Sequence, residues 1–134
     1  MRRLLILDPG LQGRIGHHYA YTEAIVRASA KRGYVAKVLA HRSVRPEVAA
    51  TLPVEAVFRD SPYSRRIEAV DVIAARAQFA ELGERFAEDI GPFRGELSFA
   101  DVIVAHTAGP HLLIGLDRTR TDLGRTTAVT LGLQ

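Results

Sequence analysis

The chain has 134 residues, of which 47% are hydrophobic and 25% charged, with 11 glycines, 6 prolines and no cysteine. This composition is typical of one folded domain. It excludes collagen, a disulfide scaffold, extensive disorder, and any site built on cysteine thiolates, such as an iron–sulfur cluster. The net charge of +3 comes from 18 basic and 15 acidic residues that are dispersed along the chain, so no nucleic-acid-binding patch is predicted.

The amino terminus carries two arginines and then only four apolar residues, 4–7, before Asp8 and Pro9. A signal peptide needs about 7–15 apolar residues and a membrane span about 20. No other segment approaches spanning length. We therefore expect a cytoplasmic protein without a transmembrane segment.

The first half of the chain reads as a strand, a helix and a second strand. Residues 3–8 form a continuous apolar run typical of a strand buried on both faces. Three glycines and a proline within residues 9–16 predict a loop. Helical spacing follows over 17–32, Gly33 stands where a C-cap belongs, and a second strand is expected over 35–40.

The middle of the chain is predicted to alternate in the same way. Residues 43–53 hold at most a short helical turn, and 54–58 form a third strand. Residues 67–90 are helical, but their apolar positions follow two phases, so we expect a kink or two helices with a break around 77–83. Gly91-Pro92 is expected to end this helix.

The last part of the chain supplies two more strands. Residues 99–106 predict a fourth buried strand, 110–116 open another helix, and 126–131 are a candidate fifth strand. His111 and the arginine-rich segment 118–125 are expected on the solvated surface of the helix.

This order of elements predicts one Rossmann-like domain over residues 1–134: a doubly wound parallel sheet of about five strands, with helices on both faces in three α/β/α layers. If the strand order is 3-2-1-4-5, the order reverses between the first and fourth strands. Ligands bind at such a reversal, outside the carboxyl ends of the strands. The loop after Asp8 and the segment at His106 would then face one another.

The loop glycines Gly10, Gly13 and Gly16 are spaced G-x-x-G-x-x-G, which differs from the G-x-G-x-x-G of dinucleotide-binding proteins. Glycine allows a close approach of the backbone, and a helix beginning near His17 offers unpaired N–H groups to an anion. A phosphate-binding loop and a loop that only turns tightly are both compatible with this pattern.

His17, His18 and Tyr19 follow the loop at the start of the helix. The histidines are candidates for hydrogen bonds to a sugar or phosphate, and the alternative is an ordinary surface pair. Tyr19 or Tyr21 could stack on a ligand ring or fill the core.

His106, at the end of the fourth strand, is a candidate ligand contact, and the alternative is a histidine bonded to a neighbouring backbone carbonyl. Asp8 could orient a histidine or a substrate hydroxyl, or could cap the loop through nearby backbone N–H groups. Five residues could together build a metal site, but no H-x-x-x-H pair supports one, so we expect no metal; they are Asp8, His17, His18, His41 and His106.

Several of these segments together resemble a known family. Residues 4–8 read LLILD, the glycine loop ends in GHHY at 16–19, the helix closes with KRGY at 31–34, and 35–40 read VAKVLA. These resemble the N-terminal domain of GT-B glycosyltransferases, particularly the family-4-like group. The segment ADVIVAHT at 100–107 is similar to that group's fourth strand, which ends in a histidine near the sugar donor.

The resemblance implies transfer of a sugar from a nucleotide-sugar donor to an acceptor sugar or lipid, without an obligatory metal or other cofactor. It assigns the catalytic contact with the transferred sugar to His106, and the approach to the donor phosphate or sugar to Gly13 and Gly16. It places His17, His18 and Tyr19 on the acceptor side.

In that family a C-terminal domain holds the nucleotide, and this chain stops at the expected fifth strand. We therefore expect an incomplete N-terminal domain that is not catalytic alone: a fragment, a truncated product or half of a split enzyme, which a lipid acceptor could hold at a membrane surface. The alternatives are a non-catalytic Rossmann-like module that binds a phosphorylated nucleotide ligand or a partner protein, and a homo-oligomer that completes itself through a second copy.

Overall fold

The computed structural model describes residues 2–62, 71–120 and 128–133. Five strands and six helical segments alternate along these residues: β1 (Arg2–Asp8), α1 (His17–Ala30), β2 (Tyr34–His41), α2 (Pro46–Ala49), β3 (Val54–Phe58), α3 (Val72–Ile90), the 3₁₀ turn η1 (Gly91–Phe93), α4 (Arg94–Phe99), β4 (Val102–Ala108), α5 (Pro110–Thr119) and β5 (Ala128–Leu133).

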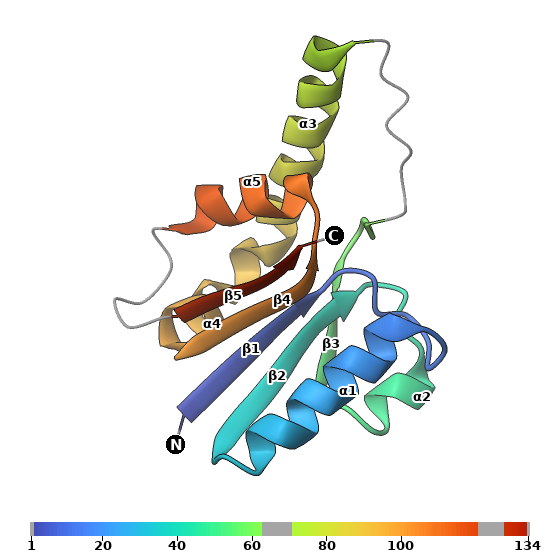
Figure 1. The fold of residues 1–134 in the computed structure, drawn as a ribbon, viewed down its shortest axis with the longest axis vertical. Helices are drawn as coiled ribbons and strands as arrows, with labels where there is room; N and C mark the ends of the chain where they lie inside the picture. Colours follow the sequence, from blue (N-terminus) through green and yellow to red (C-terminus); the bar gives the residue numbers. More distant parts are fainter. Residues whose placement is uncertain (1, 63–70, 121–127, 134) are drawn as a thin grey trace.

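The five strands form one sheet in the order β3-β2-β1-β4-β5, and every neighbouring pair is parallel. Helices α1 and α2 cover one face, and α3, α4 and α5 cover the other (Figure 1). The predicted three-layer α/β/α fold and the strand order are therefore confirmed. The order reverses at β1, which pairs with β2 on one side and β4 on the other, so the carboxyl ends of β1 and β4 flank the reversal.

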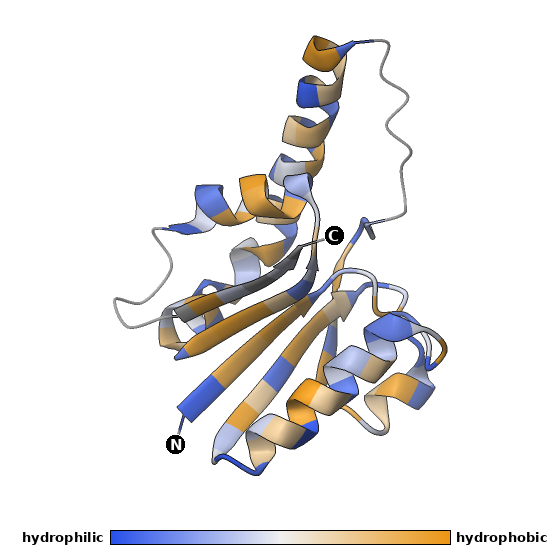
Figure 2. Cartoon of the chain, in the orientation of Figure 1, coloured by the Kyte–Doolittle hydropathy of each residue, from blue (hydrophilic) through white to orange (hydrophobic). Residues whose placement is uncertain are grey.

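Strand β1 divides the hydrophobic core into two halves. Alternate side chains of a strand point to opposite faces: Leu4 and Ile6 pack towards α1, whereas Leu5 and Leu7 pack towards α3 and α5. Figure 2 shows β1 and β4 as largely apolar ribbons between the two helical layers. Complete burial of one such leucine or isoleucine stabilises the fold by about 1.5–3 kcal/mol, and this burial fixes β1 at the centre of the sheet.

Helix α3 is continuous from Val72 to Ile90, so the predicted break around 77–83 is wrong. Residues 63–70, which include the start of the predicted segment, lie outside the described part. Only the carboxyl-terminal half of α3 packs into the core, through Leu82, Phe86 and Ile90. Its other half projects past the sheet (Figure 1). The two apolar phases therefore belong to a packed half and an exposed half of one continuous helix.

The chain continues in helical form beyond Gly91-Pro92, first as η1 and then as α4, so the expected fourth strand begins at Val102 instead of residue 99. Asp101 fixes this start. Its backbone N–H donates to the carbonyl of Arg3 at 2.9 Å, and its carboxylate accepts from the Arg3 N–H at 2.7 Å. These two bonds attach the beginning of β4 to β1.

His111 is buried, with 8% of its surface exposed, so its predicted place on the solvated surface of α5 is wrong. The helix turns this side chain towards the core and the Gly109 turn, and burial lowers the pKa of His111. Arg118 and Arg120 are exposed as expected, and 121–125 lie outside the described residues. None of the helices described here has the length and apolar character needed to cross a membrane.

Candidate functional site

Asp8 and His106 meet where the carboxyl ends of β1 and β4 lie side by side. Asp8 is the last residue of β1 and only 1% exposed, and its Oδ2 lies 3.1 Å from Nε2 of His106. The two residues are 98 positions apart in the sequence. The pairing of parallel strands brings them together, as the predicted reversal of strand order requires.

Helix α1 adds His18 and Thr22, which lie four residues apart and therefore on the same face of the helix. Nδ1 of His18 is 2.7 Å from Oδ1 of Asp8. The Thr22 hydroxyl donates to Oδ2 of Asp8 at 2.7 Å and lies 2.9 Å from Nε2 of His106. We call Asp8, His18, Thr22 and His106 the Asp8 cluster; its carboxylate has three side-chain partners from two different elements.

The Asp8 carboxyl is held in its ionised form. Burial by itself opposes ionisation, but the hydrogen bonds with His106, His18 and Thr22 outweigh it and lower the pKa of Asp8 to about 2. A buried carboxylate is stable only when hydrogen bonds or opposite charges replace its hydration. The two histidines and the threonine supply that replacement here.

One arrangement of protons satisfies every bond of His106. Its Nε2–H donates towards Asp8 and Thr22, and its Nδ1, 2.8 Å from the Thr107 hydroxyl, accepts from that hydroxyl. These contacts hold the ring in one orientation. The edge that carries Nδ1 faces the Thr107 hydroxyl.

Aromatic rings gather above the Asp8 cluster. The ring of His17 lies 4.3 Å from that of His18, and the ring of Tyr21 lies 5.7 Å from those of His17 and His106, edge-on to the latter. His17 is exposed, and Tyr21 is 55% exposed. These two exposed rings are accessible to a ligand, and the buried, ionised Asp8 carboxylate lies beneath them.

Gly10 closes the cluster from the loop side. A Cβ atom at this position would lie 2.7 Å from Nδ1 of His18 and closer still to its Cε1 and Nε2. Only glycine therefore allows the loop to lie flat on the imidazole. Gly16 has a φ of 101° immediately before α1, a conformation that favours glycine, and Gly13 lies beside the Arg45 side chain.

The structure thus brings together three of the predicted site residues, Asp8, His18 and His106, and places His17 above them. Asp8 bonds to histidines, as one of its two predicted roles requires, and His106 bonds to side chains. Tyr19 points elsewhere: it is buried in the core below α1. Its role as a ligand contact stays a prediction.

The sequence analysis missed Thr22 and Thr107. Thr22 is fully buried and bridges Asp8 and His106. Its position one helical turn after His18 is the signal that could have revealed it. Thr107 carries no such signal beyond its place next to His106.

Asp8, His18 and His106 could also hold a metal ion, since their ligand atoms lie within 4.8 Å of one another. The three residues come from β1, α1 and β4, so they do not form a short sequence motif that would predict a metal site. Both carboxylate oxygens already accept hydrogen bonds, so an ion would have to displace protons. His41 lies apart from this group, with its Nδ1 accepting from the Ser43 N–H at 3.0 Å.

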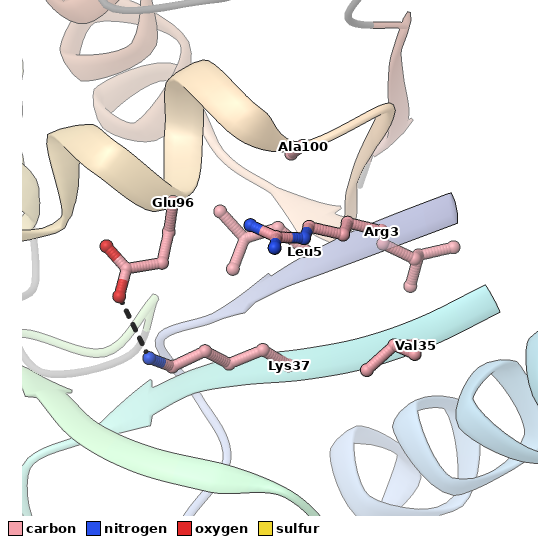
Figure 3. A pocket seen from close by; sticks show the side chains of 7 residues that line it. Arg3, Leu5, Val35, Lys37, Glu96 and Ala100 are labelled. Carbon is pink, nitrogen blue, oxygen red and sulfur yellow. Dashed lines mark hydrogen bonds and ion pairs between the residues drawn. The ribbon is translucent and has the colours of Figure 1, made fainter. Parts of the chain in front are cut away.

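A cavity of about 290 Å³ opens at the opposite end of the strands, between α4 and the beginnings of β1 and β2 (Figure 3). Apolar side chains form much of its wall, and Lys37 crosses it. The Lys37 ammonium is bound at 2.8 Å by Glu55 and at 3.0 Å by Glu96. This cavity lies away from the reversal of strand order and from the Asp8 cluster.

Comparison with known proteins does not indicate a function for this chain. No family model, curated protein or solved structure matches the chain. The fold and the Asp8 cluster, with the rings above it, therefore carry the argument that follows.

Proposed function

We propose that this chain is the acceptor-side part of a GT-B glycosyltransferase and that the crevice between the β1–α1 loop and the end of β4 binds a sugar. The observation that carries the proposal is the group of exposed rings, His17 and Tyr21, next to the oriented edge of His106. The group lies at the reversal of strand order, where doubly wound sheets bind their ligands.

Each residue has a physical role in this proposal. The faces of Tyr21 and His17 pack against the apolar face of a sugar ring. His106 contacts a hydroxyl of the transferred sugar where its ring lies beside that of Tyr21. Asp8 and Thr22 are positioning residues, because they act on the ligand only through the orientation of His106.

The loop has a separate role at the donor phosphate. Gly13 and Gly16 allow the backbone to approach it, and the first N–H groups of α1 face the same edge of the sheet. Such N–H groups stabilise the negative charge of a departing diphosphate. The nucleotide itself would be held by a second domain, so the chain alone binds weakly and does not turn over. Binding is therefore the property to measure.

The test is a titration of the labelled chain by NMR with UDP-glucose, GDP-mannose, UDP, AMP and NADP. We expect the nucleotide-sugars to shift the ring signals of His17, Tyr21 and His106. Tyr21→Ala should weaken this binding at least fivefold without changing the unfolding midpoint. Phe99→Ala is the matched control, because it removes another exposed aromatic ring at the opposite end of β4.

Two results would contradict the proposal. If AMP or NADP shifts these signals and the nucleotide-sugars do not, the chain is a nucleotide-binding module of the alternative class. If no ligand shifts the rings above the Asp8 cluster, the crevice is not a sugar site.

A further inference from the structure

A second cleft opens on the other side of the glycine loop, over the β2 side of the sheet. It has a volume of about 230 Å³ and is lined by the loop residues 12–15 together with Arg45 and Glu47. The N–H of Arg45 donates to the carbonyl of Gln12 at 2.8 Å, which joins the β1–α1 loop to the start of α2. The Arg45 side chain then runs along Gly13, with Cδ 3.8 Å from the position of a Cβ there.

Arg14 also lines this cleft, and its side chain lies over the ring of Tyr19. Its guanidinium lies 5.6 Å from the centre of the Tyr19 ring, within cation–π range. The Tyr19 hydroxyl donates to Glu23 at 2.9 Å and lies 3.1 Å from the Thr51 hydroxyl. Tyr19 is therefore immobile in the core, and its ring restricts where Arg14 can point.

The two guanidinium groups have no acidic partner in the described part of the chain, in contrast to some other arginines. Arg59, Arg85 and Arg118 are each bound to carboxylates at 2.6–2.9 Å. Among the residues described, neither Arg14 nor Arg45 has a side-chain hydrogen bond or an ion pair. Glu47 is the one acidic residue among those lining the cleft, so the lining side chains sum to a charge of +1.

We propose that this cleft binds a phosphate group, with Arg14 and Arg45 as the two cationic contacts. Guanidinium presents paired donors that match phosphate oxygens, and two of them lining one cleft can contact the same phosphate. The inference rests on the proposed function in one respect: it assigns this phosphate to the acceptor, on the side of His17, and not to the nucleotide-sugar whose hexose lies at Tyr21 and His106. The acceptor is then a phosphorylated sugar or polyol whose anionic end lies on the β2 side of the loop.

The test measures binding of inorganic phosphate, glucose 6-phosphate and glucose to the full chain at constant ionic strength. We expect glucose 6-phosphate to bind more tightly than either of the others. Arg45→Gln and Arg14→Gln should each weaken phosphate binding about tenfold, the loss of one charge-assisted contact. Glu47→Gln should strengthen it two- to fivefold, which no unfolding variant would do.

Arg32→Gln is the matched control, because it removes one positive charge beyond the other end of α1. Equal losses for Arg32→Gln and Arg45→Gln would show an unspecific charge effect and overturn the proposal. So would weaker binding in Glu47→Gln, or unchanged binding in both Arg14→Gln and Arg45→Gln.

The outcomes separate this inference from the proposed function. Phosphate binding that depends on both arginines, with no response of the Tyr21 and His106 rings to any sugar, would retain the anion site and reject the glycosyltransferase. Nucleotide-sugar binding that is weakened by Tyr21→Ala, with unchanged phosphate binding in both arginine variants, would support the glycosyltransferase and reject the anion site.

Discussion

Replacement of Gly10 by alanine tests how tightly the loop packs on the Asp8 cluster. The added methyl group would lie 2.7 Å from Nδ1 of His18 and nearer to its Cε1 and Nε2. The ring cannot retreat, because Nδ1 is already 2.7 Å from the Asp8 carboxylate beneath it. Either the loop must lift or His18 must leave Asp8.

Both responses cost stability. Overpacking of a tight site costs about 1–3 kcal/mol, and loss of a hydrogen bond to a charged group costs about 1.5–3 kcal/mol. Because the structure can take the cheaper of the two responses, we expect Gly10→Ala to lower the free energy of unfolding by about 1–3 kcal/mol. Gly95→Ala in α4 is the control, since nothing lies within 4 Å of its added Cβ. It should be neutral or slightly stabilising.

Urea unfolding at pH 7 measures these differences, and a double-mutant cycle with His18→Ala assigns them. In the His18→Ala background the imidazole is gone, so Gly10→Ala should cost less than about 1 kcal/mol. Equal costs of Gly10→Ala in both backgrounds would refute the reasoning, because the penalty would then not arise from contact with His18.

Three further predictions follow from the same contacts. The Asp8 pKa of about 2 lies below its ordinary 3.8, so its stabilisation is complete above pH 4 and is lost as the pH falls to about 2. In urea unfolding, the wild type should lose about 2 kcal/mol more over this interval than Asp8→Asn. Gly115→Ala should destabilise by about 2–3 kcal/mol, because its Cβ would lie 3.0 Å from Cγ of Phe86 where α5 crosses α3; an unchanged unfolding midpoint would contradict this. EDTA should leave the melting temperature and nucleotide-sugar binding unchanged. Tight Zn²⁺ binding that is lost in His18→Gln or His106→Gln would instead establish a metal site.

The fold was predictable wherever the signal is local. The apolar runs of β1 and β3 and the glycine after α1 mark their own elements, and the alternation of strands and helices predicts the parallel sheet. The positions that failed depend on distant packing. The two apolar phases of α3 depend on which half of the helix packs against the sheet. The burial of His111 depends on the packing of α5 against the core. Neither effect is visible in local periodicity.

The candidate site was predictable in part for the same reason. Topology alone indicates that Asp8 and His106 meet, since both end strands that flank the reversal. It does not say that the Asp8 carboxylate would be shared between His18 and His106, or that Thr22 would bridge them. Those contacts depend on the height and rotation of α1 over the sheet, which are set by Gly10 and the core beneath.

Intermolecular NOEs between the hexose protons of a bound nucleotide-sugar and the chain test the central claim most directly. The account predicts NOEs from hexose protons to the Tyr21 ring and to the ring of His106, and their loss in Tyr21→Ala. NOEs confined to the nucleobase, or to side chains away from the carboxyl ends of β1 and β4, would contradict it.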